Sequence, residues 1–284
     1  MRKLKTFLHL FFCVFALPFA PDASAEDDNF FSDWEKRASA TQTKQPGWAI
    51  PVFAPYTNLV QAFRWDATRP SSSSAGTTWN YGGGKGFNLI PWYNMQADIN
   101  VPSYFLRNKK SDEDGFGDLS FGVRYRIASG NEKHGNYTVL ANFVGSIPTG
   151  SFKNGNSDPV VTPSIGAGKG FGRCDVQSTV AIGLPLGNTR QIGRHIHWNT
   201  VAQYHLGKHF WPEIESNTTF FRGGINDGKV QHFILPGIIA GKFKLKPEDP
   251  MSRLGVTFGV GMQFATSEFH SYDHMPILSA RFVF

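Results

Sequence analysis

The sequence has little cysteine and, beyond its start, no long apolar run. Of its 284 residues only two are cysteines, Cys13 near the N-terminus and Cys174 in the remainder. After residue 25 no apolar run approaches the roughly 18 to 20 residues of a membrane helix, which excludes helical spans there. Charged residues make up only 18% of the chain, whereas it has 30 glycines and 26 phenylalanines. That composition is too aromatic for a disordered chain and too rich in glycine for a helical protein.

The first 25 residues have the features of a secretory signal peptide. Arg2, Lys3 and Lys5 give a positive start, residues 7–20 are mainly apolar, and Ala23-Ser24-Ala25 places small residues around a cleavage site. A membrane anchor is the alternative, but the apolar stretch is short for one. We predict cleavage after Ala25 and export of the mature chain. Cys13 leaves with the peptide, so Cys174 has no partner for an intramolecular disulfide.

Motifs for catalysis, metal binding and nucleic-acid binding are lacking. The net charge is +6, but the basic residues are dispersed, and Lys109-Lys110 are followed by acidic residues, so we expect no nucleic-acid partner. We find no nucleophile elbow, no paired cysteines and no phosphate-binding loop. The glycines at 82–84 suit a flexible loop. We therefore expect no enzyme activity, no cofactor and no metal site.

From Asn58 to Phe284 apolar residues recur at every second position. Leu119, Phe121, Val123, Tyr125 and Ile127 alternate with small or basic residues, and residues 254–264 show the same pattern with glycine, threonine and glutamine between. This period of two is typical of strands. A soluble sandwich also alternates, but strands of about ten residues with small polar groups on one face, in an exported chain, are typical of outer-membrane barrels.

The predicted fold is therefore all-β, a transmembrane antiparallel β-barrel. Lipid offers no hydrogen-bond partner for a free strand edge, so the sheet must close on itself. We expect a signal peptide at residues 1–25, a periplasmic N-terminal segment at 26–56 and the barrel at 57–284. The N-terminal segment lacks alternation but contains Trp34, Trp48, Phe53 and Tyr56, so we expect a loose arm or a partial plug.

The number of strands follows from the character of the connections, because bacterial barrels have an even count, short periplasmic turns and long outer loops. With Phe284 in the periplasm, we expect outer loops at residues 66–85, 108–114, 149–158, 187–193, 222–229 and 267–274. We expect inner turns near 94–96, 129–135, 169–172, 206–208 and 246–252. This arrangement predicts about twelve strands. Trp92, Tyr93, Phe210 and Trp211 fall beside inner turns, where either an aromatic girdle or buried packing accounts for them.

The last strand ends in an aromatic pattern. Phe282 and Phe284 lie on one face, with Ser279 and Arg281 on the other. A terminal phenylalanine on an alternating strand is similar to the signal by which such barrels are recognised for assembly. We predict that Phe282 and Phe284 serve as that signal, and that the partners of the protein are outer-membrane lipid, the barrel-assembly machinery and a small-molecule solute.

Charged and polar side chains gather on the face that we expect to line the lumen. A basic side chain facing lipid at the bilayer midplane costs about 2 to 4 kcal/mol, so the lumen is favoured. The candidates can either line a wet pore and set its selectivity or brace a narrow barrel through ion pairs, and both readings stay open. His195 and His197 are two residues apart, but no third metal ligand is evident. The candidate lumen residues are Asp118, Arg124, Arg126, His195, His197, Glu213, Glu215, Asn217 and Arg281, with Asp98, Asn142, Asn199 and Gln263 beside them on the same reading.

Several short motifs resemble one family of barrels. Gly115-Phe116-Gly117-Asp118, Arg124-Tyr125-Arg126, Pro212-Glu213-Ile214-Glu215 with Asn217 and Thr219, and Pro236-Gly237 are similar to the outer-membrane family labelled "putative MetA-pathway of phenol degradation". That family is called transporter-like and is grouped with fatty-acid-transporter-like barrels. The resemblance covers roughly residues 57 to 284. It implies a barrel in the outer membrane of a Gram-negative-type bacterium that passes small, hydrophobic or aromatic compounds.

Two functions of different classes remain at this point. The first is a channel or transporter for passive passage of small molecules. The second is a barrel that does not transport but anchors or binds through its outer loops. A membrane-embedded hydrolase is a third class, for which no serine–histidine pair can be assigned from the sequence. Barrels of eight strands are filled by side chains and those of 16 to 18 strands are open, so about twelve strands is intermediate.

Overall fold

The structure, a computed structural model, describes residues 30–73, 76–107, 113–151, 153–249 and 252–284. The predicted signal peptide lies outside these residues and stays a prediction, as does its cleavage. The described part contains one long helix, α2 (Phe30–Gln42), one short helix, α3 (Thr189–Ile192), and one sheet. Neither of these helices has the length and apolar character needed to cross a membrane.

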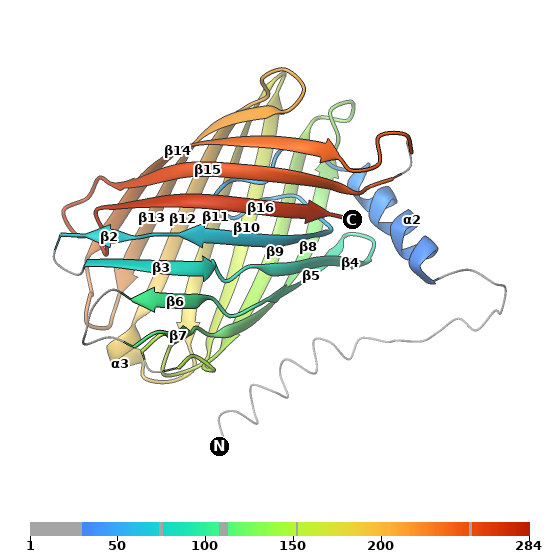
Figure 1. Cartoon of the computed structure of the whole chain (residues 1–284). Coiled ribbons are helices and arrows are strands. Elements are labelled where there is room, and N and C mark those ends of the chain that lie inside the picture. The colour runs from blue at the N-terminus through green and yellow to red at the C-terminus, as the bar shows by residue number, and fades with distance from the viewer. Residues whose placement is uncertain (1–29, 74–75, 108–112, 152, 250–251) are drawn as a thin grey trace.

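The sheet is a closed antiparallel barrel (Figure 1). Each strand pairs with its neighbours, and β16 returns to pair with β1 over seven residue pairs from Ala62↔Val283 to Thr68↔Ile277. The predicted all-β barrel is therefore confirmed. The sixteen segments of the sheet are β1 (Ala62–Thr68), β2 (Ser71–Ser72), β3 (Gly76–Gly82), β4 (Gly86–Trp92), β5 (Met95–Asn100), β6 (Tyr104–Arg107), β7 (Gly115–Phe116), β8 (Leu119–Gly130), β9 (Tyr137–Ile147), β10 (Val160–Phe171), β11 (Cys174–Pro185), β12 (Arg194–Tyr204), β13 (Phe210–Arg222), β14 (Val230–Lys244), β15 (Gly255–Ala265) and β16 (His274–Val283).

The first part of the sheet is interrupted, whereas β8 to β16 are long. β1 and β2 both pair with β16 and with β3, so the break between them lies within one path along the wall. Pro70 and Pro102 lie in two of the breaks, where a missing N–H cannot join the ladder. Gly83 and Gly84 lie in another, with φ of 59° and 63° that strand residues do not adopt.

These interruptions change two expectations. The prediction of about twelve strands differs from the sixteen segments of the hydrogen-bonded sheet, because some segments, such as β1 and β2, lie end to end along one path of the wall. The predicted outer loop at 66–85 is wrong, because most of it belongs to β1, β2 and β3. β1 begins at Ala62, so the segment without strand structure continues to Gln61 rather than ending near residue 56.

Side chains alternate between the outer and inner surfaces of the barrel. Tyr125 and Ile127 are 53% and 55% exposed on the outside, while Arg126 between them is 3% exposed. In β15, Phe258 and Val260 face outward and Gln263 is buried inside. The predicted faces of these two strands are confirmed. The inner surface is not uniformly small and polar, however, because Leu235, Ile239, Met275 and Ile277 form an apolar cluster there with Val52.

Two prolines inside strands coincide with missing pairings, in keeping with the lost donor. Around Pro163 the pairing of β10 with β11 skips from Val161↔Leu184 to Ser164↔Ala181. Around Pro236 the pairing of β14 with β15 skips from Ile234↔Phe264 to Gly237↔Gly261.

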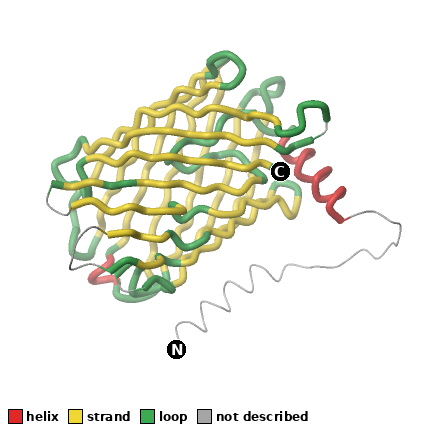
Figure 2. The backbone as a smooth tube through the Cα atoms, in the orientation of Figure 1, coloured by secondary structure: helices red, strands yellow, loops and turns green. Residues whose placement is uncertain are grey.

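The two ends of the barrel differ (Figure 2). The turn end, where α2 and the C-terminus lie, carries the connections 93–94, 131–136, 172–173, 205–209 and 245–254. The loop end carries 73–75, 108–114, 148–159, 186–193, 223–229 and 266–273. Apart from 66–85, and from 108–114, most of which lies outside the described residues, these agree with the expected positions of turns and loops. The two-residue turn after β4 needs a left-handed residue, and Asn94 supplies it with φ of 63°.

Residues 43–61, here called the luminal segment, lie inside the barrel. The segment hydrogen-bonds inward side chains of β1, β5, β8, β11, β13 and β16, which surround it. At the turn end, Ala38 of α2 packs with Leu59 and Ile90, so the helix covers that side of the opening. The lumen and this segment together form the site described next.

Candidate functional site

The charges of the inner wall are divided between two sides of the lumen. Glu213 and Glu215 lie on β13, whereas Arg281 lies on β16, Arg64 on β1, and Arg124 and Arg126 on β8. All except Arg124 are buried, and the side chain of Arg124 is only 12% exposed. The luminal segment runs between the acidic side and the basic side.

The acidic side binds backbone N–H groups of the luminal segment. Glu215 accepts from Phe53 N at 2.8 Å with one oxygen and from Ala54 N at 2.7 Å with the other. Glu213 accepts from Val52 N at 2.8 Å and from the Gln203 side chain at 2.7 Å. Hydrogen bonds from backbone N–H groups to carboxylates are about twice as strong as neutral ones. Three consecutive residues of the segment are thus held by two carboxylates.

The basic side binds backbone carbonyls of the same segment. Arg281 Nη2 donates to Pro51 O at 2.6 Å, and Arg64 donates to Pro51 O and Val52 O. Arg124 Nη1 donates to Tyr56 O at 3.0 Å, and its guanidinium lies 4.0 Å from the centre of the Tyr56 ring. The peptide dipoles therefore match the divided charge of the wall, with N–H groups toward the carboxylates and carbonyls toward the guanidiniums.

The remaining basic candidate holds the end of α2. Arg126 Nη1 donates to Thr41 O at 2.6 Å, and its other nitrogens donate to Asn94 in the turn after β4. Amide side chains also accept hydrogen bonds from the luminal segment. Gln177 accepts from Thr57 N at 3.1 Å, and Gln96 accepts from Val60 N at 2.6 Å.

The ion pairs found in the described part of the lumen do not involve Glu213 or Glu215. Among the described residues, neither Glu213 nor Glu215 lies within 4.0 Å of Arg124, Arg126 or Arg281 as a salt bridge. Instead Arg64 pairs with Asp66 at 2.8 Å, and Arg124 pairs with Asp98 at 2.8 Å. The two glutamates brace the luminal segment rather than the opposite wall.

The other candidates lie nearer the loop end. Asn217 donates to Glu215 at 3.3 Å. Asp118 accepts from Gly150 N at 3.0 Å and Asn156 N at 2.7 Å, so it fastens the loop 148–159. His197 contacts Thr219 Oγ1 at 3.1 Å, and its ring centre is 6.2 Å from that of His195. No group of three metal-ligating side chains occurs in the part of the chain that the structure describes.

One serine–histidine contact occurs on the outer face of the barrel. Ser216 Oγ lies 2.9 Å from His232 Nε2, and His232 Nδ1 contacts Thr266 Oγ1. A hydrolase needs a group that stabilises the imidazolium and free N–H donors for the oxyanion. Here the third group is a hydroxyl, and Ser216 pairs with Thr200 and Ile234 in the middle of the sheet. The geometry does not assemble a hydrolytic site.

Sequence reasoning missed Arg64 and Asp66. They lie in β1, and their alternation with Trp65, which is exposed on the outside, is the signal that could have found them. Asp66 falls in the stretch 66–85, whose composition predicts a loop rather than a strand. Gln96 and Gln177 were missed because neutral amides on a predicted inward face give no charge signal.

The aromatic residues near the turn end lie partly on the outer surface and partly in the lumen. Phe282 faces outward and its ring lies 6.1 Å from that of Phe284. Trp92, Tyr93 and Phe210 are exposed on the outside near the turn end, which suits a girdle. Trp211 is different, because it points into the lumen and stacks on His205 with ring centres 4.0 Å apart.

A closed antiparallel barrel with an apolar exterior and a charged interior defines the class of outer-membrane β-barrels with a channel-like, porin-like fold. Residues 57–238 match the protein family described as "Putative MetA-pathway of phenol degradation". The chain belongs to that family, as its motifs predict.

Solved structures of outer-membrane channels share the fold. The COG4313 outer membrane channel from Pseudomonas putida F1 is 13% identical, with 79% of this chain and 96% of that chain covered and a TM-score of 0.53. The NanC porin is 10% identical, with 78% and 100% covered and a TM-score of 0.50. Identities this low show a likeness of fold. A comparison with curated protein sequences gives no significant match.

Proposed function

We propose that this protein is a channel in the outer membrane of a Gram-negative-type bacterium, through which small molecules pass without energy input. In this proposal the luminal segment constricts the channel, and the turn end faces the periplasm. The fold shared with outer-membrane channels supports the proposal of a channel. The short turns and the C-terminus at the turn end support the proposal that this end faces the periplasm.

The observation that carries the proposal is the way in which the lumen charges are used. Glu213, Glu215 and Arg281 each hold backbone groups of the luminal segment. Hydrogen bonds of this kind contribute about 1.5 to 3 kcal/mol each and can be exchanged for water. A displaced segment would leave a polar path lined by both signs of charge, which is what a selective pore requires.

The solutes in this proposal are small and carry hydrophobic or aromatic groups. Two features support that choice. The family is described by a pathway of phenol degradation, and the inner wall carries the apolar cluster of Leu235, Ile239, Met275 and Ile277. Phenol itself is not part of the proposal. We further propose two partners of this protein. Outer-membrane lipid contacts the exposed apolar surface, and the barrel-assembly machinery binds the C-terminal strand.

The test is conductance of the refolded mature chain in planar bilayers. The double variant Glu213→Gln with Glu215→Gln weakens the hold on residues 52–54 and is expected to raise the conductance several-fold. Glu248→Gln, in the exposed turn 245–254, is the matched control and should leave it unchanged. Slower migration of boiled than unheated protein on detergent gels shows that each variant is folded.

The same experiment addresses the second function, a barrel that anchors or binds through its outer loops. The observation in its favour is that the luminal segment is held on both of its sides by buried groups. The channel would be contradicted, and this alternative favoured, by two results together. Neither the folded wild type nor the folded double variant would conduct ions, and the double variant would melt at a much lower temperature.

A further inference from the structure

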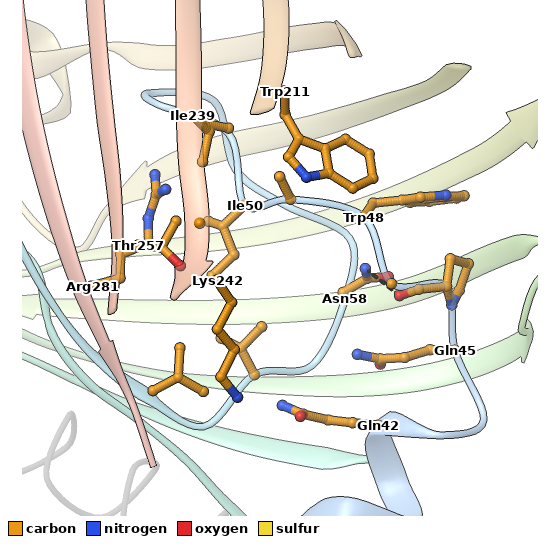
Figure 3. A pocket seen from close by; sticks show the side chains of 16 residues that line it. Gln42, Gln45, Trp48, Ile50, Asn58, Trp211, Ile239, Lys242, Thr257 and Arg281 are labelled. Atoms are coloured by element: carbon orange, nitrogen blue, oxygen red, sulfur yellow. Dashed lines mark hydrogen bonds between the residues drawn. The ribbon is translucent and has the colours of Figure 1, made fainter. Parts of the chain in front are cut away.

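A cavity of about 280 Å³ lies inside the barrel between the luminal segment and strands β13 to β16. Figure 3 shows this cavity from close by. Its wall is formed by Gln42, the last residue of α2, by the luminal segment, and by residues of the four strands. It is smaller than the roughly 300 to 1,000 Å³ of pockets for drug-sized ligands, so it suits a compound of about one ring.

Two basic side chains line one side of the cavity. Arg281 is 2% exposed. Its Nη2 donates to Pro51 O, and its Nε and Nη1 are closed off by the surrounding protein without a hydrogen-bond partner among the described residues, so Arg281 contributes charge to the cavity rather than a free donor. Lys242 also lines the cavity, and no described residue accepts a hydrogen bond from its ammonium. No aspartate or glutamate is among the lining residues, so positive charge here is not balanced at the cavity itself.

Two indole rings line the other side. Figure 3 shows Trp48 and Trp211 across the cavity from Lys242 and Arg281. Both rings are held in place, because Trp48 Nε1 donates to Asn136 at 3.1 Å and Trp211 stacks on His205. Ile50 and Ile239 add apolar surface to the lining. The cavity is therefore basic on one side and aromatic on the other.

We propose that this cavity binds a small aromatic carboxylate. The ring of the ligand lies against Trp48 and Trp211, and its carboxylate faces the ammonium of Lys242, with the buried charge of Arg281 in the same wall. An aliphatic acid would use the basic groups but leave the indole surface uncovered, and a neutral ring would leave the ammonium of Lys242 without an acceptor. The inference rests on the proposed function, since it names the class of solute that the channel takes up.

The probe for the experiment is sodium benzoate, titrated by calorimetry into the refolded full mature chain. We expect saturable binding of benzoate, and binding at least tenfold weaker for acetate and for benzyl alcohol, each of which lacks one of the two groups. Lys242→Met should weaken benzoate binding at least fivefold. Lys244→Met, on the same strand and exposed outside the cavity, should stay within twofold.

The aromatic side has its own pair of variants. Trp211→Leu should weaken benzoate binding at least fivefold, whereas Trp198→Leu, which removes an outward indole of β12, should not. Heat-dependent gel mobility shows that each variant is folded. Benzoate that fails to saturate, that binds Lys242→Met as tightly as wild type, or that binds no better than benzyl alcohol overturns the inference.

Conductance separates this inference from the proposed function. If the protein conducts ions but does not bind benzoate, the channel function stands and the aromatic-carboxylate site is refuted. If it binds benzoate with the expected variant profile but does not conduct ions in bilayers, the site stands and the channel function is refuted.

Discussion

The carboxylate of Glu215 accepts the backbone N–H of Ala54 at 2.7 Å, across 161 positions of sequence. Its other oxygen accepts from Phe53 at 2.8 Å. Both contacts are to main-chain groups, so the glutamate recognises the conformation of the luminal segment and not its side chains. The wall of the barrel and the N-terminal part of the chain are joined at this point.

Glu215→Gln should therefore destabilise the protein. The amide keeps one acceptor oxygen but turns an NH₂ group toward one of the two N–H donors. We expect a loss of about 1 to 3 kcal/mol in the free energy of unfolding, because one buried donor is left without a partner. Urea-induced unfolding in lipid vesicles measures it, and Glu248→Gln in the exposed turn is the control. Equal stability of the two variants would contradict the described contacts.

The Arg64–Asp66 pair makes a second prediction about stability. Both side chains are 4% exposed, and Ser279 Oγ also donates to Asp66 at 2.6 Å. Asp66→Asn leaves a buried guanidinium without its counter-charge, which should cost on the order of 3 kcal/mol. Asp33→Asn, which removes the exposed pair with Lys36, should cost less than about 1 kcal/mol. Similar unfolding curves for the two variants would count against the buried pair.

Assembly should depend on the C-terminal aromatics. Deletion of Phe284, or the double change Phe282→Ser with Phe284→Ser, removes the stacked pair at the closing strand. We expect degradation or periplasmic accumulation, measured by fractionation of cells. Tyr125→Ser, which removes an outward aromatic from β8, should reach the outer membrane. Normal outer-membrane levels of the Phe284 deletion would show that the terminal residue is not the signal.

Orientation can be tested with single cysteines in a Cys174→Ser background, which is needed because Cys174 is exposed. Cysteines at Ser73, Asn156 and Ile225, all at the loop end, should react with an impermeant thiol reagent on intact cells. Cysteines at Lys208 and Lys246, at the turn end, should react only after the cells are opened. The opposite labelling pattern would invert the orientation.

The loop 266–273 should respond to pH. His270 Nδ1 faces Ser267 O at 2.9 Å and Nε2 faces Asp273 Oδ1 at 3.0 Å, so both ring nitrogens meet acceptors. The Ser267 carbonyl, and then Asp273, raise the pKa of His270 above its ordinary value. A raised pKa means that the contact contributes fully below the ordinary pKa and is lost as pH rises through the raised one.

Hydrogen exchange in residues 266–273, corrected for the intrinsic effect of pH, should therefore be slower near pH 6 than near pH 8. Asp273→Asn should reduce that difference, because it removes one acceptor from the imidazolium. A wild-type loop with the same corrected exchange rate at both pH values would refute the linkage.

The sequence by itself determined the barrel and the direction of its side chains. Alternation at period two depends only on neighbouring residues, so the outward Tyr125 and Ile127 and the inward Arg126 could be read directly. The positions of the loops and turns between β8 and β16 could also be predicted, because glycine, asparagine and charged residues gather in them. Where the alternation is broken, as between Arg69 and Gly86, local pattern could not distinguish an interrupted wall from a loop.

Only the tertiary structure decided what the lumen charges do. The expected alternatives for Glu213 and Glu215 were a wet pore or a brace to an arginine, since the sequence shows charges but not which groups lie across a closed lumen. The groups across it are peptide N–H groups of residues 52–54, which every sequence possesses and which carry no compositional signal. Trp211 was ambiguous for a related reason, because one residue of register at a strand end separates a lipid-facing ring from one that lines a cavity.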